Sequence, residues 1–113
     1  MREVLKRPQV RKDIMEQADY LALTSMNASD RFLQAIQKAF RKIAETPGIG
    51  SPRDFGDPKL LGLRALLVPG FPKVGIYYLY DDETVEIVRV LHGARDVAGI
   101  LGPERDEESE EGL

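Results

Sequence analysis

The residues best suited to chemistry follow an apolar segment near the end of the chain. Residues 85–91 are mostly β-branched or aliphatic, and a polar cluster follows them: His92, Gly93, Arg95 and Asp96. His92 is the only histidine, and imidazole is the side chain that titrates closest to neutral pH. We therefore expect a polar cluster at the end of a strand, in which His92 either takes part in function or bonds a backbone carbonyl or Asp96.

Two arginines in this segment have a structural and a functional interpretation. Arg95 could pair with Asp96 or with a helix, or it could form a binding patch together with Asp96. Arg89 lies in phase with apolar residues of the same strand, namely Val85, Ile87 and Leu91. A buried Arg89 would therefore need a carboxylate partner, which the sequence does not identify.

The first half of the chain predicts a short strand and two helices that would support this cluster. Residues 2–5 are the strand candidate, and Pro8 suits the first position of a helix. The apolar residues of this helix recur every three or four positions: Val10, Ile14, Ala18, Leu21 and Ala22. Asp13 belongs to the opposite, polar side. Asn27 or Ser29 would cap a second helix, whose apolar stripe is Phe32, Leu33, Ile36, Ala39, Phe40 and Ile43.

The second half predicts a sheet. Residues 47–63 form a connector rich in glycine and proline, and strand candidates follow at 64–68, 74–80 and 84–91. The turns between them are too short for crossover helices, so the strands must be antiparallel neighbours. The expected fold is α+β, with a short N-terminal strand and a helical hairpin packed on a C-terminal antiparallel sheet of three to four strands.

Composition limits the kinds of site that the chain can build. With no cysteine and one histidine, it has neither a disulfide framework nor a thiolate or multi-imidazole metal site. We therefore expect no structural metal and no cofactor. No apolar run approaches the roughly 20 residues of a membrane helix, and the first residues lack the apolar centre of a signal peptide. We expect a cytoplasmic protein that does not contact membranes.

Charge divides the chain into two parts. Residues 104–113 contain six of the 19 acidic residues and one of the 16 basic ones, which leaves residues 1–103 slightly basic. We expect residues 1–103 to form one domain and residues 104–113 to be a solvated, disordered tail. The alternative is that the tail competes with an acidic or nucleic-acid partner for a basic patch.

The ordered set of motifs resembles the ParE branch of the ParE/RelE toxin superfamily. The matching segments are DIMEQADYLA at 13–22, ASDRFLQAI at 28–36, ETPGIGSPR at 45–53 and the sheet residues 62–96, which end in VLHGARD. The resemblance implies the toxin of a type II toxin–antitoxin system, held inactive by a small DNA-binding antitoxin in a hetero-oligomer. It also implies DNA gyrase as the target, bound non-covalently. Sequence-specific DNA binding would fall to the antitoxin, because this chain has no basic recognition helix.

RelE-type relatives suggest an alternative, which is ribosome-dependent mRNA cleavage. Attack by a 2′-hydroxyl needs a base, an acid and cations that converge on one phosphate. A minimal set would be Arg64, Arg89, His92 and Arg95. The chain departs from the nuclease pattern, because Val74, Gly75 and Ile76 stand where those enzymes have a basic residue, and no tyrosine lies near its C-terminus. A third possibility is a degenerate, non-toxic module that binds an antitoxin.

For a gyrase-binding toxin, we expect two groups of contact residues. Target-binding candidates are Arg64, Phe71, His92, Arg95 and Asp96, with Arg64 either a binding residue or a charge that protects an edge strand. Antitoxin-binding candidates are Tyr20, Phe32, Ile36, Phe40 and Phe55. Phe55 and Phe71 stand beside glycine or proline in loops, so we expect them to be exposed anchors. Three tyrosines of the middle strand are expected to pack in the core: Tyr77, Tyr78 and Tyr80.

Overall fold

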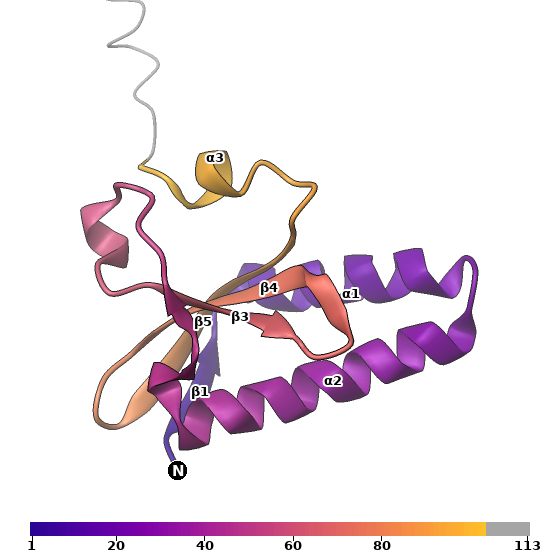
Figure 1. Cartoon of the computed structure of the whole chain (residues 1–113), viewed down its shortest axis with the longest axis horizontal. Helices are drawn as coiled ribbons and strands as arrows, with labels where there is room; N and C mark the ends of the chain where they lie inside the picture. The colour runs from indigo at the N-terminus through magenta and orange to yellow at the C-terminus, as the bar shows by residue number, and fades with distance from the viewer. Residues whose placement is uncertain (104–113) are drawn as a thin grey trace, which may run out of the picture.

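A computed structural model describes residues 1–103 of the chain, and the acidic segment 104–113 lies outside the described residues. Figure 1 shows the arrangement of the elements. In chain order they are β1 (Glu3–Lys6), α1 (Pro8–Ala22), α2 (Met26–Glu45), the short 3-10 helix η1 (Pro47–Ile49), β2 (Ser51–Pro52), the 3-10 helix η2 (Pro58–Leu60), β3 (Arg64–Val68), β4 (Phe71–Tyr80), β5 (Thr84–His92) and α3 (Val97–Leu101). The fold is α+β, as the sequence predicts.

The sheet has five strands in the order β1-β5-β4-β3-β2. It is mixed rather than purely antiparallel, because β1 pairs with β5 in parallel, with Val4 opposite Val85. The β3, β4 and β5 strands form the predicted meander. The strand that the sequence does not predict is β2, which pairs with Arg64 and Ala65 of β3. It has only two residues, one of them a proline, so no alternation of apolar and polar residues marks it.

The helical hairpin begins and turns at specific caps. Pro8 occupies the first turn of α1, as expected. The cap of α2 is Ser25, whose hydroxyl oxygen accepts a hydrogen bond from the Ala28 N–H at 3.0 Å. The prediction of Asn27 or Ser29 was wrong, because the helix begins earlier. Ser29 is buried within α2, and its hydroxyl donates to the Ala18 carbonyl at 2.8 Å, which ties the two helices together.

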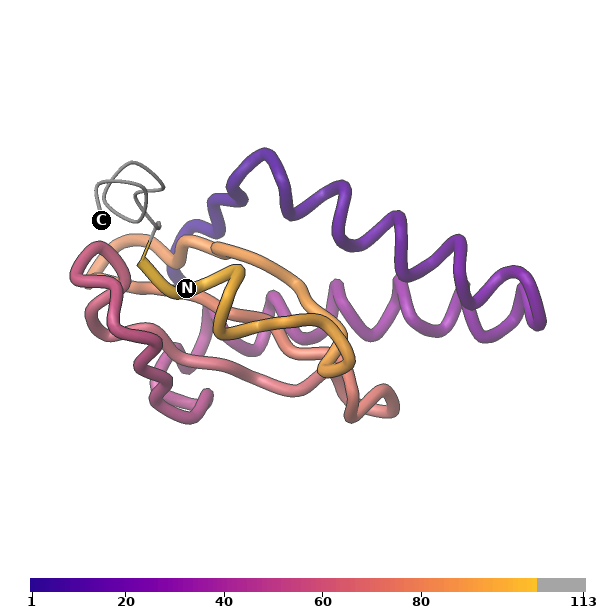
Figure 2. The backbone as a smooth tube through the Cα atoms, turned by 90° about the horizontal axis from the view of Figure 1, so that it is seen from above, coloured from indigo at the N-terminus to yellow at the C-terminus, as the bar shows by residue number. Residues whose placement is uncertain are grey.

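The larger core lies between the hairpin and one face of the sheet. Figure 2 shows both helices continuing past the end of the strands. Buried residues of α2 pack there against buried residues of the three meander strands; the cluster includes Phe32, Ile36, Ile43, Val68, Ile76, Tyr78, Val85, Ile87 and Val90. The predicted stripe of α2 is therefore confirmed as core, with Leu33 only partly buried.

The other face of the sheet has a smaller core, formed with the connector and α3 (Figure 1). Its buried members are Leu63, Val88, Leu91 and Leu101. The register between β4 and β5 shifts at Tyr77 and Tyr78, where Val88 has no counterpart. This bulge changes the phase of β5, so Ile87 and Leu91 belong to different cores. The prediction that Arg89 shares a face with Val85, Ile87 and Leu91 was therefore wrong.

Candidate functional site

A buried ion pair joins α1 to β5. The Arg89 guanidinium donates to both carboxylate oxygens of Asp13 at 2.8 Å, and the Val90 N–H donates to Asp13 Oδ2 at 3.0 Å. Burial alone would raise the pKa of Asp13, but the hydrogen bonds from Arg89, Val90 and Gln9 outweigh it and lower that pKa. The bond to Asp13 also raises the pKa of Arg89. Arg89 therefore has the carboxylate partner that burial requires, although Asp13 was predicted on the polar side of its helix.

The position of Asp13 follows from where β1 ends. β1 pairs with β5 only as far as Lys6 and Ile87, and the chain then turns into α1. Beyond that point the edge of β5 has no strand neighbour among residues 1–103, so α1 covers it and Asp13 accepts the Val90 N–H. A carboxylate that satisfies a free edge N–H and an arginine together is fully bonded. Asp13 is thus a structural residue.

Arg64 and Tyr78 fasten the connector to the sheet. The Tyr78 hydroxyl donates to the Pro47 carbonyl at 2.6 Å and accepts from the Gly50 N–H at 2.8 Å. Burial raises the pKa of Tyr78, and the Gly50 hydrogen bond opposes this. Arg64 donates to the Gly50 carbonyl at 2.6 Å. Because β2 pairs with Arg64, this residue does not lie on an edge strand, so its predicted edge-protecting role was wrong.

The four residues of the minimal nuclease set do not converge. Arg64 pairs with Tyr78, whereas Arg89 pairs with the preceding residue, Tyr77. Neighbouring residues of a strand face opposite sides of the sheet, so Arg64 and Arg89 lie on opposite faces. His92 pairs with Val74, four positions along β4 from Tyr78. At about 3.4 Å per residue, that separates Arg64 from His92 by roughly 13 Å along the sheet.

The polar cluster after β5 forms a turn on the surface. His92 Nδ1 accepts the Ala94 N–H at 3.0 Å, rather than bonding a carbonyl or Asp96. In neutral His92 the proton is therefore assigned to Nε2. Arg95 pairs with Glu16 of α1 at 3.6 Å, with about half of each side chain exposed. Asp96 caps α3 by accepting the Gly99 N–H at 3.0 Å.

Beside His92 the sheet has a hollow of about 400 Å³ on the face away from the hairpin core. Its floor is flat because Gly75 has no side chain: a Cβ there would lie 3.1 Å from the Tyr77 ring, which crosses it. Leu67 is 54% exposed and lines the hollow together with Lys73. Sequence reasoning missed Leu67 and Lys73. Residues 65–68 of β3 are all apolar, so no polar residue among them marks which face is open and Leu67 gives no signal.

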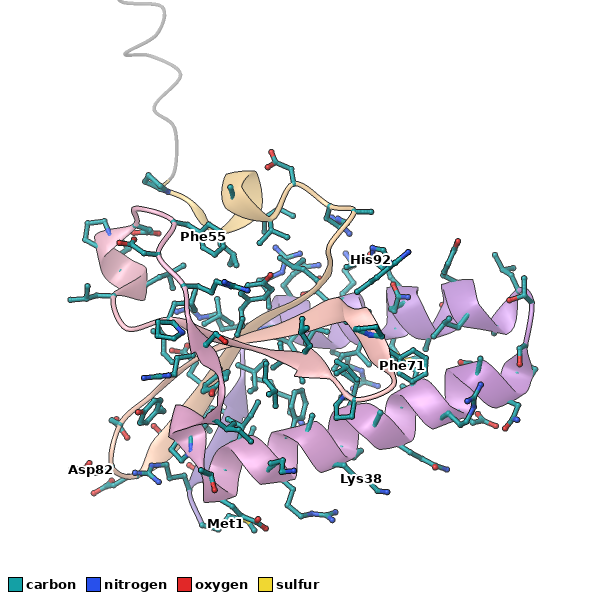
Figure 3. The ribbon with its side chains drawn as sticks, in the orientation of Figure 1. Met1, Lys38, Phe55, Phe71, Asp82 and His92 are labelled. Atoms are coloured by element: carbon teal, nitrogen blue, oxygen red, sulfur yellow. The ribbon has the colours of Figure 1, made fainter. Side chains whose placement is uncertain are left out.

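The two expected aromatic anchors, Phe71 for the target and Phe55 for the antitoxin, are less exposed than predicted. Phe71 is half-buried and packs edge-on against Phe32, with ring centroids 5.2 Å apart. Phe55 is also half-buried and contacts Tyr77, 6.2 Å between centroids. Figure 3 shows Phe71 and His92 toward one end of the sheet, with Asp82 at the other. The prediction of Phe55 and Phe71 as exposed anchors was wrong, because both pack on aromatic rings of the cores.

A groove of about 500 Å³ lies between β1, α1 and α2. Apolar side chains and the cations Lys6, Arg7 and Arg11 line it; the apolar members include Ile14, Met15, Leu33, Ile36 and Phe40. We call this space the hairpin groove. Met15 and Leu5 nearby are 46% and 47% exposed, so the surface around it is partly apolar.

The antitoxin-binding candidates divide between this groove and other places. Ile36 and Phe40 are almost fully buried but contribute to the groove lining. Phe32 is fully buried in the core and offers no surface, so its prediction as a contact residue was wrong. Tyr20 is 66% exposed near the turn of the hairpin, away from the groove lining. Of the predicted core tyrosines, Tyr78 is buried, whereas Tyr80 is 40% exposed beneath the Arg2 guanidinium.

Comparison with known proteins identifies the family. A sequence model described as "ParE toxin of type II toxin-antitoxin system, parDE" matches residues 4–97. The chain belongs to the ParE toxin family. This match includes the hairpin groove and every residue of the His92 hollow, and it ends before the acidic segment. No curated protein matches the sequence.

A solved structure of this kind supports the fold. A chain of the structure titled "Chromosomal ParDE TA system from P. aeruginosa" superposes with a TM-score of 0.62 at 16% sequence identity. The match covers 81% of this chain and 96% of the other. Within residues 1–103, no helix is long and apolar enough to cross a membrane. The same residues contain no group of three or more His, Asp or Glu side chains placed to hold a metal ion.

Proposed function

We propose that this ParE-family toxin inhibits DNA gyrase by non-covalent binding in the cytoplasm, and that a cognate antitoxin neutralises it. The observation that carries the proposal is the separation of the cationic residues over both faces of the sheet. Arg64 binds connector carbonyls, Arg89 binds Asp13 and His92 accepts a backbone N–H. Each side chain therefore has a structural or local contact, whereas a phosphate-cleaving site needs its acid, base and cations around one phosphate.

The hollow beside His92 is the surface that we assign to the target. Leu67 and Tyr77 offer apolar contact area, and Lys73 and His92 add polar groups at its edge. A small apolar centre with a polar rim is the usual composition of a binding hot spot. Arg95 and Asp96, which the sequence predicts as target-binding residues, lie in the adjoining turn and would extend the contact.

The hairpin groove is the surface that we assign to the antitoxin. Its apolar floor and cationic edge suit an amphipathic segment that carries carboxylates, which is a common mode of helix-in-groove recognition. Ile36 and Phe40 would contact such a segment from the floor. Because the groove and the His92 hollow share no residues, binding at one does not by itself cover the other.

The test is a gyrase assay on plasmid DNA with the purified chain. We expect loss of supercoiling and trapped double-strand breaks, both reversed by the antitoxin encoded beside the toxin. Leu67→Asp and Lys73→Glu change exposed side chains of the hollow. Each should raise the toxin concentration needed for half-maximal inhibition about tenfold, which is equivalent to about 1.4 kcal/mol of binding free energy. Lys38→Glu, on the outer side of α2, is the control and should act like the parent protein.

Two outcomes would overturn this proposal. Unchanged plasmid together with mRNA cuts at ribosome-occupied codons would establish the nuclease alternative, especially if Arg64→Ala and His92→Ala removed them. Unchanged plasmid, intact mRNA and normal growth, with tight antitoxin binding, would establish a non-toxic binding module.

A further inference from the structure

Cations line both the hollow at Gly102 and the hairpin groove, among them Lys59, Arg7, Lys6 and Arg11. We propose that the acidic segment 104–113 binds these cations within its own chain and so occupies the entrance of the groove. In the structure the segment begins directly after Pro103, which lies against the connector beside Gly56. The proposal concerns a segment outside the family match and does not depend on which target the toxin inhibits.

Two hollows with shared lining residues form the path that we assign to the segment. The first, of about 540 Å³, is lined by Gly102, Lys59, Arg7 and Pro8 among other residues. The second is the hairpin groove, which Arg7 and Pro8 also line. Gly102 therefore lines a hollow that shares Arg7 and Pro8 with the groove. Arg11 lies one helical turn beyond Arg7, about 6 Å along α1.

The cations of this path differ in whether they already have a partner. Arg7 pairs with Glu86 at 2.8 Å, and Arg89 pairs with Asp13. Within residues 1–103, no carboxylate lies within 4.0 Å of Lys6, Arg11 or Lys59. These three cations are available to an acidic ligand, although the Lys6 ammonium also lies over the Phe40 ring, 5.6 Å from its centroid. The acid that lines the first hollow, Asp57, caps η2 by accepting the Lys59 N–H at 2.9 Å.

The acidic segment has the charge and the length for this path. It contains six acidic residues and one arginine, so its net charge is −5. Ten extended residues span at most about 33 Å, and the hollow where they begin is lined by both Gly102 and Arg7. Its attachment to the same chain gives it an effective concentration on the order of millimolar. Weak, exposed charge pairs can then keep the path substantially occupied at low salt.

The consequence is competition for the groove, and this step alone depends on the antitoxin role proposed above. An acidic ligand must displace the segment from Lys6 and Arg11 before it reaches the floor. We expect a two- to tenfold weaker apparent affinity than for a chain whose segment is uncharged. The difference should shrink as salt rises, because screening removes exposed charge pairs.

The test uses the full chain labelled with ¹⁵N and a variant whose six acids become amides: E104Q, D106N, E107Q, E108Q, E110Q and E111Q. We expect amide shifts to differ between the two at residues 6, 7, 9–11 and 59, and to be equal in the His92 hollow. Roughly 0.5 M salt should remove most of the difference. Lys6→Glu with Arg11→Glu in the full chain should reproduce the shifts of the neutral variant beyond the substituted sites, whereas Lys38→Glu, on the outer side of α2 (Figure 3), should not.

Equal spectra for the parent and neutral-segment chains at low salt would overturn the proposal. Differences confined to other surfaces, such as the cations of α2, would also overturn it. Because the readout is a spectrum of the free protein, failure here leaves the gyrase assay unaffected. An inactive toxin, equally, leaves this result intact.

Discussion

Arg89 and Arg95 stand six residues apart in one motif and bind the same helix, yet their environments differ. Arg89 makes two hydrogen bonds of 2.8 Å with Asp13, whose side chain is 1% exposed. Arg95 reaches Glu16, one turn further along α1, at 3.6 Å and about half exposed. The first pair is buried and fully hydrogen-bonded, whereas the second is surrounded by water.

The comparison teaches that the motif changes role at the end of the strand. Up to Val90 its polar groups hold α1 on the free edge of β5. From His92 onward they shape a surface turn beside the hollow that we assign to the target. Neighbouring residues of the motif therefore have different roles: some stabilise the fold and others contribute to the proposed binding surface. Substitutions should separate the two effects.

The largest expected effect comes from breaking the buried pair. Asp13→Ala should lower the free energy of unfolding by about 3 kcal/mol, because it leaves the partly buried Arg89 guanidinium and the Val90 N–H without their acceptor. Urea unfolding followed by circular dichroism measures the change. Glu16→Ala is the matched control on the same helix and should change stability by less than about 0.5 kcal/mol. Equal losses for the two variants would refute the contrast between the pairs.

A second buried polar contact extends the comparison to the connector. Tyr78→Phe removes the hydroxyl that bonds Pro47 and Gly50, and should cost about 1–3 kcal/mol because both backbone groups lose a buried partner. Thermal unfolding measures it. Tyr80→Phe, in the same strand but partly exposed, is the control. If Tyr78→Phe proved neutral, the hydroxyl would not fasten the connector.

The buried pair should also contribute to acid sensitivity. The pKa of Asp13 is below the usual 3.8, so its ionised form is favoured in the folded chain. Its stabilisation is fully present above about pH 4 and is lost as the pH falls below 3.8 through the folded pKa. Stability measured between pH 2 and 6 should fall less steeply in Asp13→Asn than in the parent chain.

A control is needed because Asp81 also has a lowered pKa. Its carboxylate accepts the N–H groups of Thr84 and Glu83 in the exposed β4–β5 turn. Asp81→Asn should independently reduce the slope of stability against pH. The stability of the double variant should therefore depend less on pH than that of either single variant. A parent curve that runs parallel to the Asp13→Asn curve from pH 6 to pH 2 would show that the pair does not titrate as expected.

The smallest effect on stability is expected at the exposed arginine. Arg95→Ala should change the free energy of unfolding by less than about 0.5 kcal/mol, since surface pairs contribute little. The same variant should weaken gyrase inhibition if the turn belongs to the target surface. Measuring both quantities on one protein sharpens the comparison. If Arg95→Ala lowered stability but left gyrase inhibition unchanged, Arg95 would be a structural residue and not a target-binding one.

Apolar spacing predicted the elements because burial imposes a period. The apolar stripe from Phe32 to Ile43 repeats every three or four residues and forms the buried face of α2. β3 was predicted at its observed bounds, residues 64–68. Elements without such a period were missed, namely the two-residue β2 and the five-residue α3. The cap at Ser25 was missed because several residues nearby are equally good caps.

The candidate site was predicted in residue type but not in arrangement. The polar turn at 92–96 and the need of Arg89 for a carboxylate follow from residue order. Residue order does not show that Asp13 is this carboxylate. Asp13 lies 76 positions from Arg89, and the spacing of its helix placed it on the polar side. Exposure of Leu67 and burial of Phe71 likewise depend on neighbouring elements, because the sequence marks both simply as apolar.

By itself, the sequence determined the α+β class, the order of the main elements and the ParE-like motifs, because local periodicity and turn residues are properties of short segments. Only the tertiary structure decided which charges are buried, because the β5 bulge and the end of β1 set which groups meet. It placed Arg64 and Arg89 on opposite faces and opened the His92 hollow above Gly75. Those contacts join residues far apart in the chain, and no short segment contains that information.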